Sequence, residues 1–302
     1  MKDRALRPTD WESYIGQEKL KERLQISING ATQRGGALDH VLLVGPPGAG
    51  KTSLASLIAL ELMEDFHPFV MPLKPKAIQK IFLERSGVIF LDEVHRLPKK
   101  DQEMLLPIME DFEVPFDNGS LMKIEHTMTV VAATTELRLL IEPLRDRFTH
   151  KPKFDLYTDE EMGKIVTQMA NGVGMNIPAE DALALGRASA GVPRQARTLV
   201  LTARDLSTTR PNRVLATAGI TSDGLTEDHV DYVLALDKLG QIAGVDVLAN
   251  YTGQPKDVIV KLEKLLLRKG FIDYSQKGRV LTIEGYKVAK DIQANNKQQN
   301  NR

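Results

Sequence analysis

One segment of eight residues near the start of the chain constrains the fold more than any other feature. It consists of Gly45, Pro46, Pro47, Gly48, Ala49, Gly50, Lys51 and Thr52. An apolar run, Val41–Val44, precedes it and a helical pattern follows it, and this order is the required context of a P-loop. The glycines let consecutive backbone N–H groups and the helix N-terminus point at a phosphate. We expect Lys51 to reach the β- and γ-phosphate oxygens of a nucleotide, Thr52 to offer a hydroxyl to Mg²⁺, and Ser53 to complete the site. A glycine-rich turn that matches by chance is the alternative.

Three apolar runs rich in β-branched residues alternate with helical patterns between Trp11 and about residue 150. They are Val41–Val44, Val88–Leu91 and Thr129–Ala133, and each is typical of a buried strand. The alternation predicts an α/β domain, a parallel sheet with flanking helices, which we place at residues 1–152. Ligands of such sheets bind at the carboxyl ends of the strands, so polar residues there are candidate site residues.

Two carboxylates end the second of these runs. Asp92 and Glu93 follow Leu91 directly. Beside a P-loop, Asp92 is expected to hold the Mg²⁺ shell with Thr52, and Glu93 to polarise an attacking water. Carboxylates after a strand are also common as loop residues or helix caps, so the neighbouring P-loop is what favours the catalytic interpretation.

Two threonines and two arginines lie further along the chain. Thr134 and Thr135 close the third run, and because alternate residues of a strand face opposite sides, we expect only one hydroxyl to meet the γ-phosphate. Threonine is also favoured at strand ends by its β propensity alone. Arg145 and Arg147 are surplus to one nucleotide site, which suggests an arginine finger acting on the nucleotide of a neighbouring subunit. A surface salt-bridge cluster is the alternative.

Helix signals replace the strand patterns over residues 153–240. Thr158 and Glu161 have capping-box spacing, while Pro178 and Pro193 stand where helices begin. A helical lid domain is therefore expected. Arg194 lies in the first turn of one of these helices, where a cation opposes the helix dipole, so an anionic partner such as a nucleotide phosphate is the more natural interpretation.

The pattern changes again over residues 241–292. A short helix, a longer helix ending at Gly270, two brief strands around Gln276-Lys277-Gly278 and a final helical stretch follow one another. Helix, turn, helix and hairpin form the order of a winged-helix domain. The last ten residues, 293–302, are almost all Gln, Asn and Lys, which predicts a disordered tail.

In this order the motifs resemble an AAA+ ATPase, and shorter segments resemble the RuvB family in particular. The segments are Tyr14-Ile15-Gly16-Gln17, Leu38 to Leu43, Asp92 to Leu97, Met109 to Phe112, Ala133 to Thr135, Pro143 to Phe148, Lys269 to Ile272, and Lys277-Gly278-Arg279. The similarity runs from about Arg7 to Val280. It implies a hexameric ring that uses ATP and Mg²⁺ to pump double-stranded DNA in branch migration of Holliday junctions, four-way junctions to which the junction binder RuvA normally delivers it. DNA recombination and repair follow as its setting.

The resemblance also implies roles for single residues. The adenine side of the nucleotide would be cradled by Arg7, Tyr14 and Ile15, joined from the lid by Tyr157 and Pro193. Thr135 would be the phosphate sensor of the first domain and Arg194 that of the lid. Of the two arginines, Arg147 fits the family's finger better, with Arg145 in support.

Two segments are shorter than in the family. Glu113–Glu125 stands where RuvB proteins carry a longer β-hairpin that docks onto RuvA, although Asn118-Gly119 still predicts a hairpin turn. The connection to the winged helix is also short, so we expect its first helix to be missing or merged with Glu227–Leu239. Both differences weigh against a RuvA-like partner more than against the ATPase. They indicate a compact, divergent member, such as one encoded by a phage or mobile element.

The C-terminal domain carries the candidate DNA contacts. They are Lys261, Lys264 and Arg268 on one helix face, opposite a buried stripe of Ile259, Leu262 and Leu266, and Lys277 and Arg279 at the tip of the wing. Residues 241–302 hold 11 basic and 6 acidic side chains, whereas the whole chain has 40 of each, so a basic end offsets an acidic remainder. Such charges can neutralise phosphates without reading bases. Charged faces are also often merely solvated, and winged helices also dock proteins.

Composition excludes several other classes of protein. The chain lacks cysteine, which removes disulfides, zinc knuckles and thiol catalysis, and its six histidines show no metal-ligand spacing. His95, beside the acidic pair, is expected to be structural rather than catalytic, and Trp11 to serve packing. No apolar run approaches the ~20 residues that cross a bilayer, so we expect a cytoplasmic protein without membrane contact, in a bacterial cell or a phage-infected host.

Two other functions fit an AAA+ protein that ends in a winged helix. One is a replication initiator or a helicase or clamp loader, in which ATP hydrolysis acts as an assembly switch. The other is a DNA-binding scaffold that holds ATP without turnover, which the presence of both Glu93 and Arg147 disfavours.

Overall fold

A computed structural model describes residues 6–240 and 242–300 of the protein. The chain divides into two compact units. One comprises the residues up to Gly186 together with Gly191–Val200, and the other comprises Arg187–Ala190 together with the residues from Leu201.

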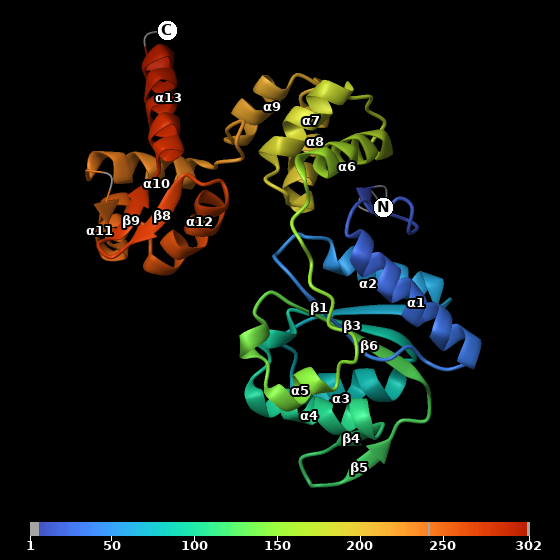
Figure 1. The fold of residues 1–302 in the computed structure, drawn as a ribbon. Coiled ribbons are helices and arrows are strands. Elements are labelled where there is room, and N and C mark those ends of the chain that lie inside the picture. The colour runs from blue at the N-terminus through green and yellow to red at the C-terminus, as the bar shows by residue number, and fades with distance from the viewer. Residues whose placement is uncertain (1–5, 241, 301–302) are drawn as a thin grey trace. The chain divides into compact units, whose positions relative to one another are not determined.

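A four-stranded parallel sheet forms the centre of the first unit (Figure 1). Its strands, in spatial order, are β1 (Val41–Val44), β6 (Met128–Thr134), β3 (Gly87–Asp92) and β2 (Phe66–Val70). The three runs predicted as strands are confirmed as β1, β3 and β6. Sequence patterns did not reveal β2, which contains Pro68 and occupies an edge, the position where a residue without an N–H is tolerated.

Helices cover both faces of this sheet, so the predicted α/β fold class is confirmed (Figure 1). On one face, α1 (Glu18–Arg34) and α2 (Lys51–Glu61) pack against Val41, Leu43 and Phe90. On the other, α3 (Pro75–Glu84), α4 (Lys99–Glu110) and α5 (Glu142–Asp146) pack against Leu42, Ile89 and other strand residues. Apolar residues therefore face both sides of each central strand, which explains the continuous apolar runs.

Short elements connect these layers. The 3-10 turns η2 (Val94–Arg96) and η3 (Leu137–Leu139) follow β3 and β6. Strands β4 (Glu113–Pro115) and β5 (Leu121–Lys123) pair antiparallel, with Gly119 at φ 81 in the turn between them. The predicted short hairpin is therefore confirmed, and Leu121 and Met122 on it are exposed.

The segment after residue 153 is helical, as predicted. Its helices are α6 (Asp159–Gly172), α7 (Ala179–Ala188), α8 (Pro193–Asp205) and α9 (Pro211–Ala218). Thr158 caps α6 by a capping box with Glu161, and α8 begins at Pro193.

A winged helix occupies the C-terminal part of the second unit. It contains α10 (Glu227–Lys238), β7 (Ile242–Ala243), α11 (Val245–Thr252), α12 (Lys256–Arg268), β8 (Ile272–Ser275), β9 (Gly278–Leu281) and α13 (Ile283–Asn300). The sheet has the order β7-β9-β8. Tyr232 and Leu236 of α10 share one apolar core with Leu248, Ile259 and Leu281, so α10 serves as the first helix of the winged helix, merged as expected, rather than as part of the lid.

The expectation of a disordered tail from residue 293 differs from the structure, because α13 continues to Asn300. Lys290 Nζ and Gln293 Nε2 both contact Asp237 Oδ2, at 3.1 and 2.9 Å, which holds this helix against α10. Gln and Lys are good helix formers, so a composition too polar for a core still extends a helix that is already formed. The last two residues of the expected tail, 301–302, lie outside the described residues.

Among residues 6–240 and 242–300, no helix combines the length and the apolar content that crossing a membrane requires.

Candidate functional site

The carboxyl ends of three neighbouring strands bring the predicted site motifs together. The P-loop follows β1, Thr134 ends β6 and Asp92 ends β3, with β6 between the other two. A cleft of about 340 Å³ lies at this edge. It is lined by Pro47, Gly48, Gly50, Lys51, Thr52 and Ser53 of the P-loop, by Asp92 and Glu93, and by Leu6, Arg7, Met169, Pro193, Arg194 and Arg197.

The P-loop adopts a conformation that glycine permits and other residues resist. Gly48 has φ 78 and Gly50 has φ 102, and α2 begins at the next residue, Lys51. A Cβ on Gly48 would lie 2.8 Å from the Cβ of Arg194. The loop therefore turns sharply beneath α8, and its curvature leaves backbone N–H groups at the start of α2 without partners inside the helix.

Lys51 lies across this loop. Its Nζ donates to the carbonyl oxygens of Gly45 and Pro46, each at 2.9 Å. Burial lowers the pKa of Lys51, and the charges of Glu93 and Asp92 oppose that shift. A cation is thereby held among two carboxylates and a helix N-terminus, an arrangement suited to a phosphate chain.

The two carboxylates differ in their surroundings. Burial and the charge of Glu93 raise the pKa of Asp92, whose Oδ1 accepts a hydrogen bond from the Glu93 N–H at 3.0 Å. Glu93 has a left-handed backbone, with φ 54, which turns the chain out of β3 immediately after Asp92. Consecutive strand residues would point to opposite faces of the sheet. Because of this turn, Asp92 and Glu93 both line the cleft.

The two threonines also separate, as the strand alternation predicted. Thr134 is fully buried and its Oγ1 lies 3.1 Å from His95 Nδ1, whereas Thr135 Oγ1 donates to Glu93 Oε2 at 3.3 Å. The same carboxylate oxygen lies 3.4 Å from His95 Nδ1. Only Thr135 therefore reaches the carboxylate of the cleft, and His95 fastens the turn after β3 to the end of β6.

Helix α8 closes one side of the cleft through its first turn. The Arg194 N–H donates to the Gly48 carbonyl at 3.4 Å, so the backbone of α8 contacts the P-loop directly. Arg194 and, one turn later, Arg197 line the cleft. The sequence prediction that Arg194 stands at a phosphate site fits this position, while Arg197 was missed although its i+3 spacing from Arg194 places it on the same helix face.

A smaller cavity of about 70 Å³ adjoins the P-loop and collects the residues expected around an adenine. It is lined by Leu6, Pro8, Ser13, Tyr14, Ile15, Gly50, Ser53, Tyr157, Ile165, Gln168, Met169 and Pro193. Arg7 lines the larger cleft instead. Sequence reasoning missed Ile165 and Met169 of α6, because a helix core stripe looks the same whether it faces a protein core or a ligand.

Tyr14 and Tyr157 brace the P-loop in addition to lining this cavity. Tyr157 Oη donates to the Ala49 carbonyl at 3.2 Å and Tyr14 Oη to the Gly50 carbonyl at 3.4 Å. Both side chains are buried, and burial raises the pKa of each hydroxyl. They remain neutral donors that bind the carbonyls of the loop.

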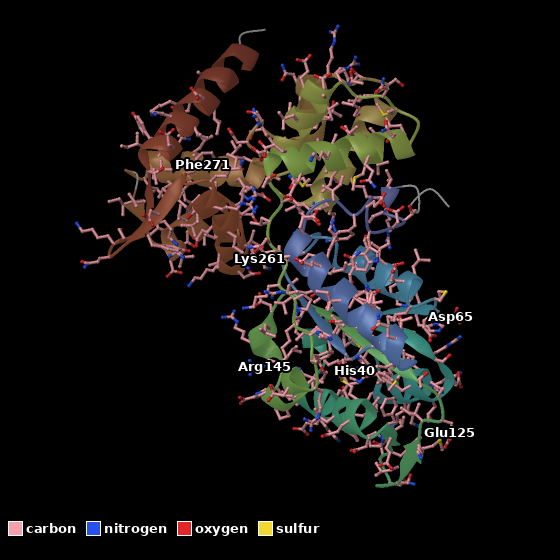
Figure 2. All side chains as sticks on the ribbon, turned by 45° about the vertical axis from the view of Figure 1, so that its right-hand side comes forward. His40, Asp65, Glu125, Arg145, Lys261 and Phe271 are labelled. Atoms are coloured by element: carbon pink, nitrogen blue, oxygen red, sulfur yellow. The ribbon has the colours of Figure 1, made fainter. Side chains whose placement is uncertain are left out.

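Arg145 and Arg147 are not among the residues that line the cleft. Arg147 Nη2 forms an ion pair with Glu110 Oε2 at the end of α4, and Arg145 lies on α5 (Figure 2). Within the described part of the chain, the buried Nε atoms of both arginines lack hydrogen-bond partners.

The candidate Mg²⁺ ligands fit the metal's chemistry. Thr52 and Asp92 both line the cleft and offer a hydroxyl and a carboxylate oxygen. Mg²⁺ in phosphate sites takes one or two such ligands and fills the rest of its shell with phosphate oxygens and waters. Over residues 6–240 and 242–300, no cluster of three or more histidine and acidic side chains suggests another metal site.

The five candidate DNA-binding residues differ in how much of their charge is left for a partner. Lys264 and Lys277 are exposed, and Lys261 Nζ, also exposed, pairs with Asp257 at 2.9 Å. Arg268 Nη2 donates to the Ala190 carbonyl at 2.6 Å. Ile259, Leu262 and Leu266 are buried, as predicted.

Arg279 differs from the expectation. Its guanidinium forms an ion pair with the buried Glu263 at 2.7 Å and leaves its side chain only 18% exposed. The charge that the wing sequence seemed to offer to a phosphate is therefore already neutralised inside the domain. Sequence reasoning missed Glu263, since an acidic residue on a basic helix looks like part of a solvated face.

Two family models match the chain. One, "Holliday junction DNA helicase RuvB P-loop domain", matches residues 6–154, and the other, "RuvB C-terminal winged helix domain", matches residues 222–290.

Curated relatives and solved structures extend this similarity over most of the chain. The Holliday junction branch migration complex subunit RuvB of a Nitratiruptor species is 34% identical over 95% of this chain and 92% of its own length. The subunit of the same name from Fervidobacterium nodosum is 36% identical over 94% of this chain and 88% of its own. A solved structure of the Thermotoga maritima RuvB Holliday junction branch migration motor has a TM-score of 0.81 and 32% identity, covering 95% of this chain and 98% of that one.

Proposed function

Because this chain belongs to the RuvB family, we propose that it is an ATPase that drives branch migration of Holliday junctions by moving double-stranded DNA. The observation that carries the proposal is the cleft in which Lys51, Thr52, the two carboxylates and Arg194 meet. A winged helix in the same chain supplies a candidate DNA-binding module. We assign residues 1–152 to the nucleotide-binding domain, the following helices to the lid, and the winged helix to the residues from 222 onward.

The nucleotide of this motor is ATP with Mg²⁺. The start of α2 and Lys51 hold the β- and γ-phosphates, while Thr52 and Asp92 hold the metal, which supplies charge neutralisation to the phosphates when bound. Ile15 and Pro193, which line the smaller cavity beside the P-loop, would contact the base. Glu93 orients the attacking water and takes its proton, a role for which its position beside Asp92 in the lining of the cleft is suited.

Thr135 and Arg194 are the residues through which the presence of the γ-phosphate would affect Glu93 and α8. Thr135 donates a hydrogen bond to Glu93, so a hydroxyl directly after β6 sets the direction of the carboxylate that activates water. Arg194 stands at the first turn of α8, so a contact with the γ-phosphate would be transmitted along that helix. Loss of the γ-phosphate would remove this side-chain contact and leave the backbone bond between Arg194 and Gly48.

The arginine finger comes from the neighbouring subunit. Arg147, supported by Arg145, lies outside its own cleft, which favours action in trans and therefore a ring of subunits. A hexamer is the ring we propose. The cation stabilises negative charge that develops on the transferred phosphoryl group, an effect worth on the order of 10³–10⁵ in rate for such fingers.

The partners we propose are double-stranded DNA and four-way junctions. A RuvA-like junction binder would have to use the short hairpin β4–β5, whose exposed Leu121 and Met122 offer a small apolar surface. Bacterial cytoplasm, where DNA and ATP are available, is the proposed location.

A synthetic four-way junction with one labelled strand tests this function. The full-length protein with ATP and Mg²⁺ should convert the junction to two duplexes, and Lys51→Ala should abolish both the conversion and phosphate release. DNA-stimulated phosphate release without any strand movement would instead indicate a loader that uses hydrolysis as an assembly switch. The measurement is repeated with a RuvA-type protein, because strand movement only in its presence would establish the partnership.

A further inference from the structure

A buried carboxylate lies at the centre of the winged helix, and it is not one of the residues that line the nucleotide cleft. Glu263 is a residue of α12 and its side chain is 1% exposed. It follows Leu262 and stands between Lys261 and Lys264, the lysines of the basic helix face. A charge removed from water so completely is costly unless hydrogen bonds and an opposite charge compensate it.

Four hydrogen bonds fill both oxygens of this carboxylate. Oε1 accepts from Arg279 Nε at 2.7 Å and from Tyr232 Oη at 3.2 Å. Oε2 accepts from Tyr274 Oη at 2.7 Å and from Arg279 Nη2 at 3.2 Å. The Arg279 guanidinium also lies 5.4 Å from the centre of the Tyr274 ring. We name these four residues, Glu263, Arg279, Tyr232 and Tyr274, the wing lock.

Each member of the wing lock comes from a different element. Tyr232 belongs to α10, Glu263 to α12, Tyr274 to β8 and Arg279 to β9. Strands β8 and β9 form the wing, paired through Tyr274 and Arg279, which stand directly opposite each other. The carboxylate therefore joins both wing strands to the two helices beneath them by side-chain bonds, in addition to the bond between the strands.

The wing lock has no net charge to offer to DNA. Glu263 and Arg279 cancel, and Arg279 uses Nε and Nη2 on the carboxylate. Lys277, in the turn between the strands, is exposed, and its N–H donates to Ser275 Oγ at 3.2 Å. Of the two cations that flank Gly278 in the sequence, Arg279 is therefore paired inside the domain, whereas Lys277 is exposed and can meet a phosphate.

We propose that Glu263 and Arg279 are positioning residues that fix the wing on α10 and α12, and that Lys277 supplies the phosphate-facing charge at the wing tip. The DNA contact of Lys277 rests on the proposed function, whereas the positioning role of Glu263 and Arg279 does not. A wing that is fixed on α10 and α12 holds Lys277 at a constant position, which suits contact with a regular phosphate backbone.

Two variants test the lock in the full-length protein. Glu263→Gln keeps the shape of the side chain and removes one negative charge from the domain, and Tyr274→Phe removes one hydroxyl without any change of charge. Tyr251→Phe, on the exposed face of α11, is the matched control. Amide hydrogen exchange of residues 272–281 should become about tenfold faster in both lock variants, the size expected for losing one hydrogen bond to a charged group, and stay unchanged in the control.

DNA affinity as a function of salt then separates positioning from charge. Glu263→Gln should weaken binding of a duplex although it makes the wing more positive, with an unchanged salt slope. Lys277→Ala should lower the slope of log K against log salt by about 0.9, the value for one lost phosphate contact, and leave wing exchange unchanged. Lys80→Ala, an exposed lysine of α3, is the charge control.

Each outcome decides one part of the proposal. Unchanged wing exchange in Tyr274→Phe and Glu263→Gln, or tighter DNA binding by Glu263→Gln, would overturn the positioning role. A salt slope that falls in Glu263→Gln but not in Lys277→Ala would overturn the assignment of the phosphate contact to Lys277. Faster wing exchange with DNA affinity unaffected by every variant would sustain the lock and reject the wing as the DNA contact of the proposed function.

Discussion

His40 links the stability of the nucleotide-binding domain to pH through two hydrogen bonds with defined directions. The Val130 N–H donates to His40 Nδ1 at 3.0 Å, and His40 Nε2 lies 3.1 Å from the Met109 carbonyl. His40 is labelled in Figure 2. Nδ1 must therefore be an acceptor and Nε2 a donor, which fixes the neutral tautomer. A second proton on Nδ1 would point at the N–H of Val130, a residue on a fully buried strand.

The sign of the effect follows from the pKa. Burial lowers the pKa of His40 below its ordinary value of 6.5, outweighing the contact with the Met109 carbonyl. As pH falls below 6.5, the unfolded chain takes up this proton while the folded chain resists it, so unfolding becomes easier. The free energy of unfolding falls by up to about 1.4 kcal/mol per pH unit until the folded pKa is passed, and it is constant above about pH 7.5.

Two substitutions separate the proton from the hydrogen bonds. His40→Gln offers a donor and an acceptor at every pH, so its stability should lose the pH dependence that His40 contributes. His40→Phe leaves the Val130 N–H and the Met109 carbonyl without partners, at a cost of about 1–3 kcal/mol each.

Urea unfolding read by Trp11 fluorescence measures the effect in the relevant domain. Trp11 packs against the core on the α1–α2 face of the sheet, and it is the one tryptophan of the chain, so it reports the unit that contains His40. His229, whose pKa is also lowered by burial, belongs to the other unit. His67→Gln serves as control. Parallel stability curves for wild type and His40→Gln between pH 7.5 and 5 would refute the reasoning.

Three further predictions concern other parts of the chain. Gly50→Ala should weaken ATP binding at least tenfold, because φ 102 is strained by about 1–3 kcal/mol for alanine and the new Cβ would lie 2.8 Å from Tyr14 Oη; Gly36→Ala, with open space around it, should leave ATP titrations unchanged. Asp92→Asn should raise the Mg²⁺ concentration for half-maximal phosphate release, whereas Asp117→Asn in the exposed hairpin turn should not, and equal Mg²⁺ curves would remove Asp92 from the metal site. Asp237→Ala removes the acceptor shared by Lys290 and Gln293, so far-UV circular dichroism should report fewer helical residues; an unchanged spectrum would mean that α13 persists without that anchor.

Sequence patterns predicted the parts of the fold in which local chemistry and tertiary position agree. The P-loop needs its glycines wherever it occurs, and the runs that became β1, β3 and β6 are apolar on both faces because helices cover both. The edge strand β2 was not predicted because Pro68 and His67 break the strand pattern. Its half-exposed position tolerates both residues. The carboxyl-edge residues were predictable since parallel strands bring their ends together.

The remaining differences arise where a partner distant in sequence decides the role of a side chain. Arg279 looks like a free cation until Glu263, 16 residues earlier, turns it inward. Tyr14 and Tyr157 are 143 residues apart, yet both brace the P-loop. The polar stretch after residue 292 is helical because Asp237 anchors it from α10. No local pattern encodes such pairings.

Mixing two inactive chains tests most directly whether the ATPase sites are shared between subunits. Arg147→Ala should hydrolyse no ATP while binding it nearly as wild type, and Lys51→Ala should fail to bind it. In a ring assembled from equal amounts of both, roughly a quarter of the interfaces join an intact Lys51 to an intact Arg147 of the neighbour, as expected for random head-to-tail assembly. Recovery of ATP hydrolysis and of junction movement in the mixture is the predicted result. Complete inactivity of a mixture that forms rings would contradict shared sites and the role of Arg147 in them.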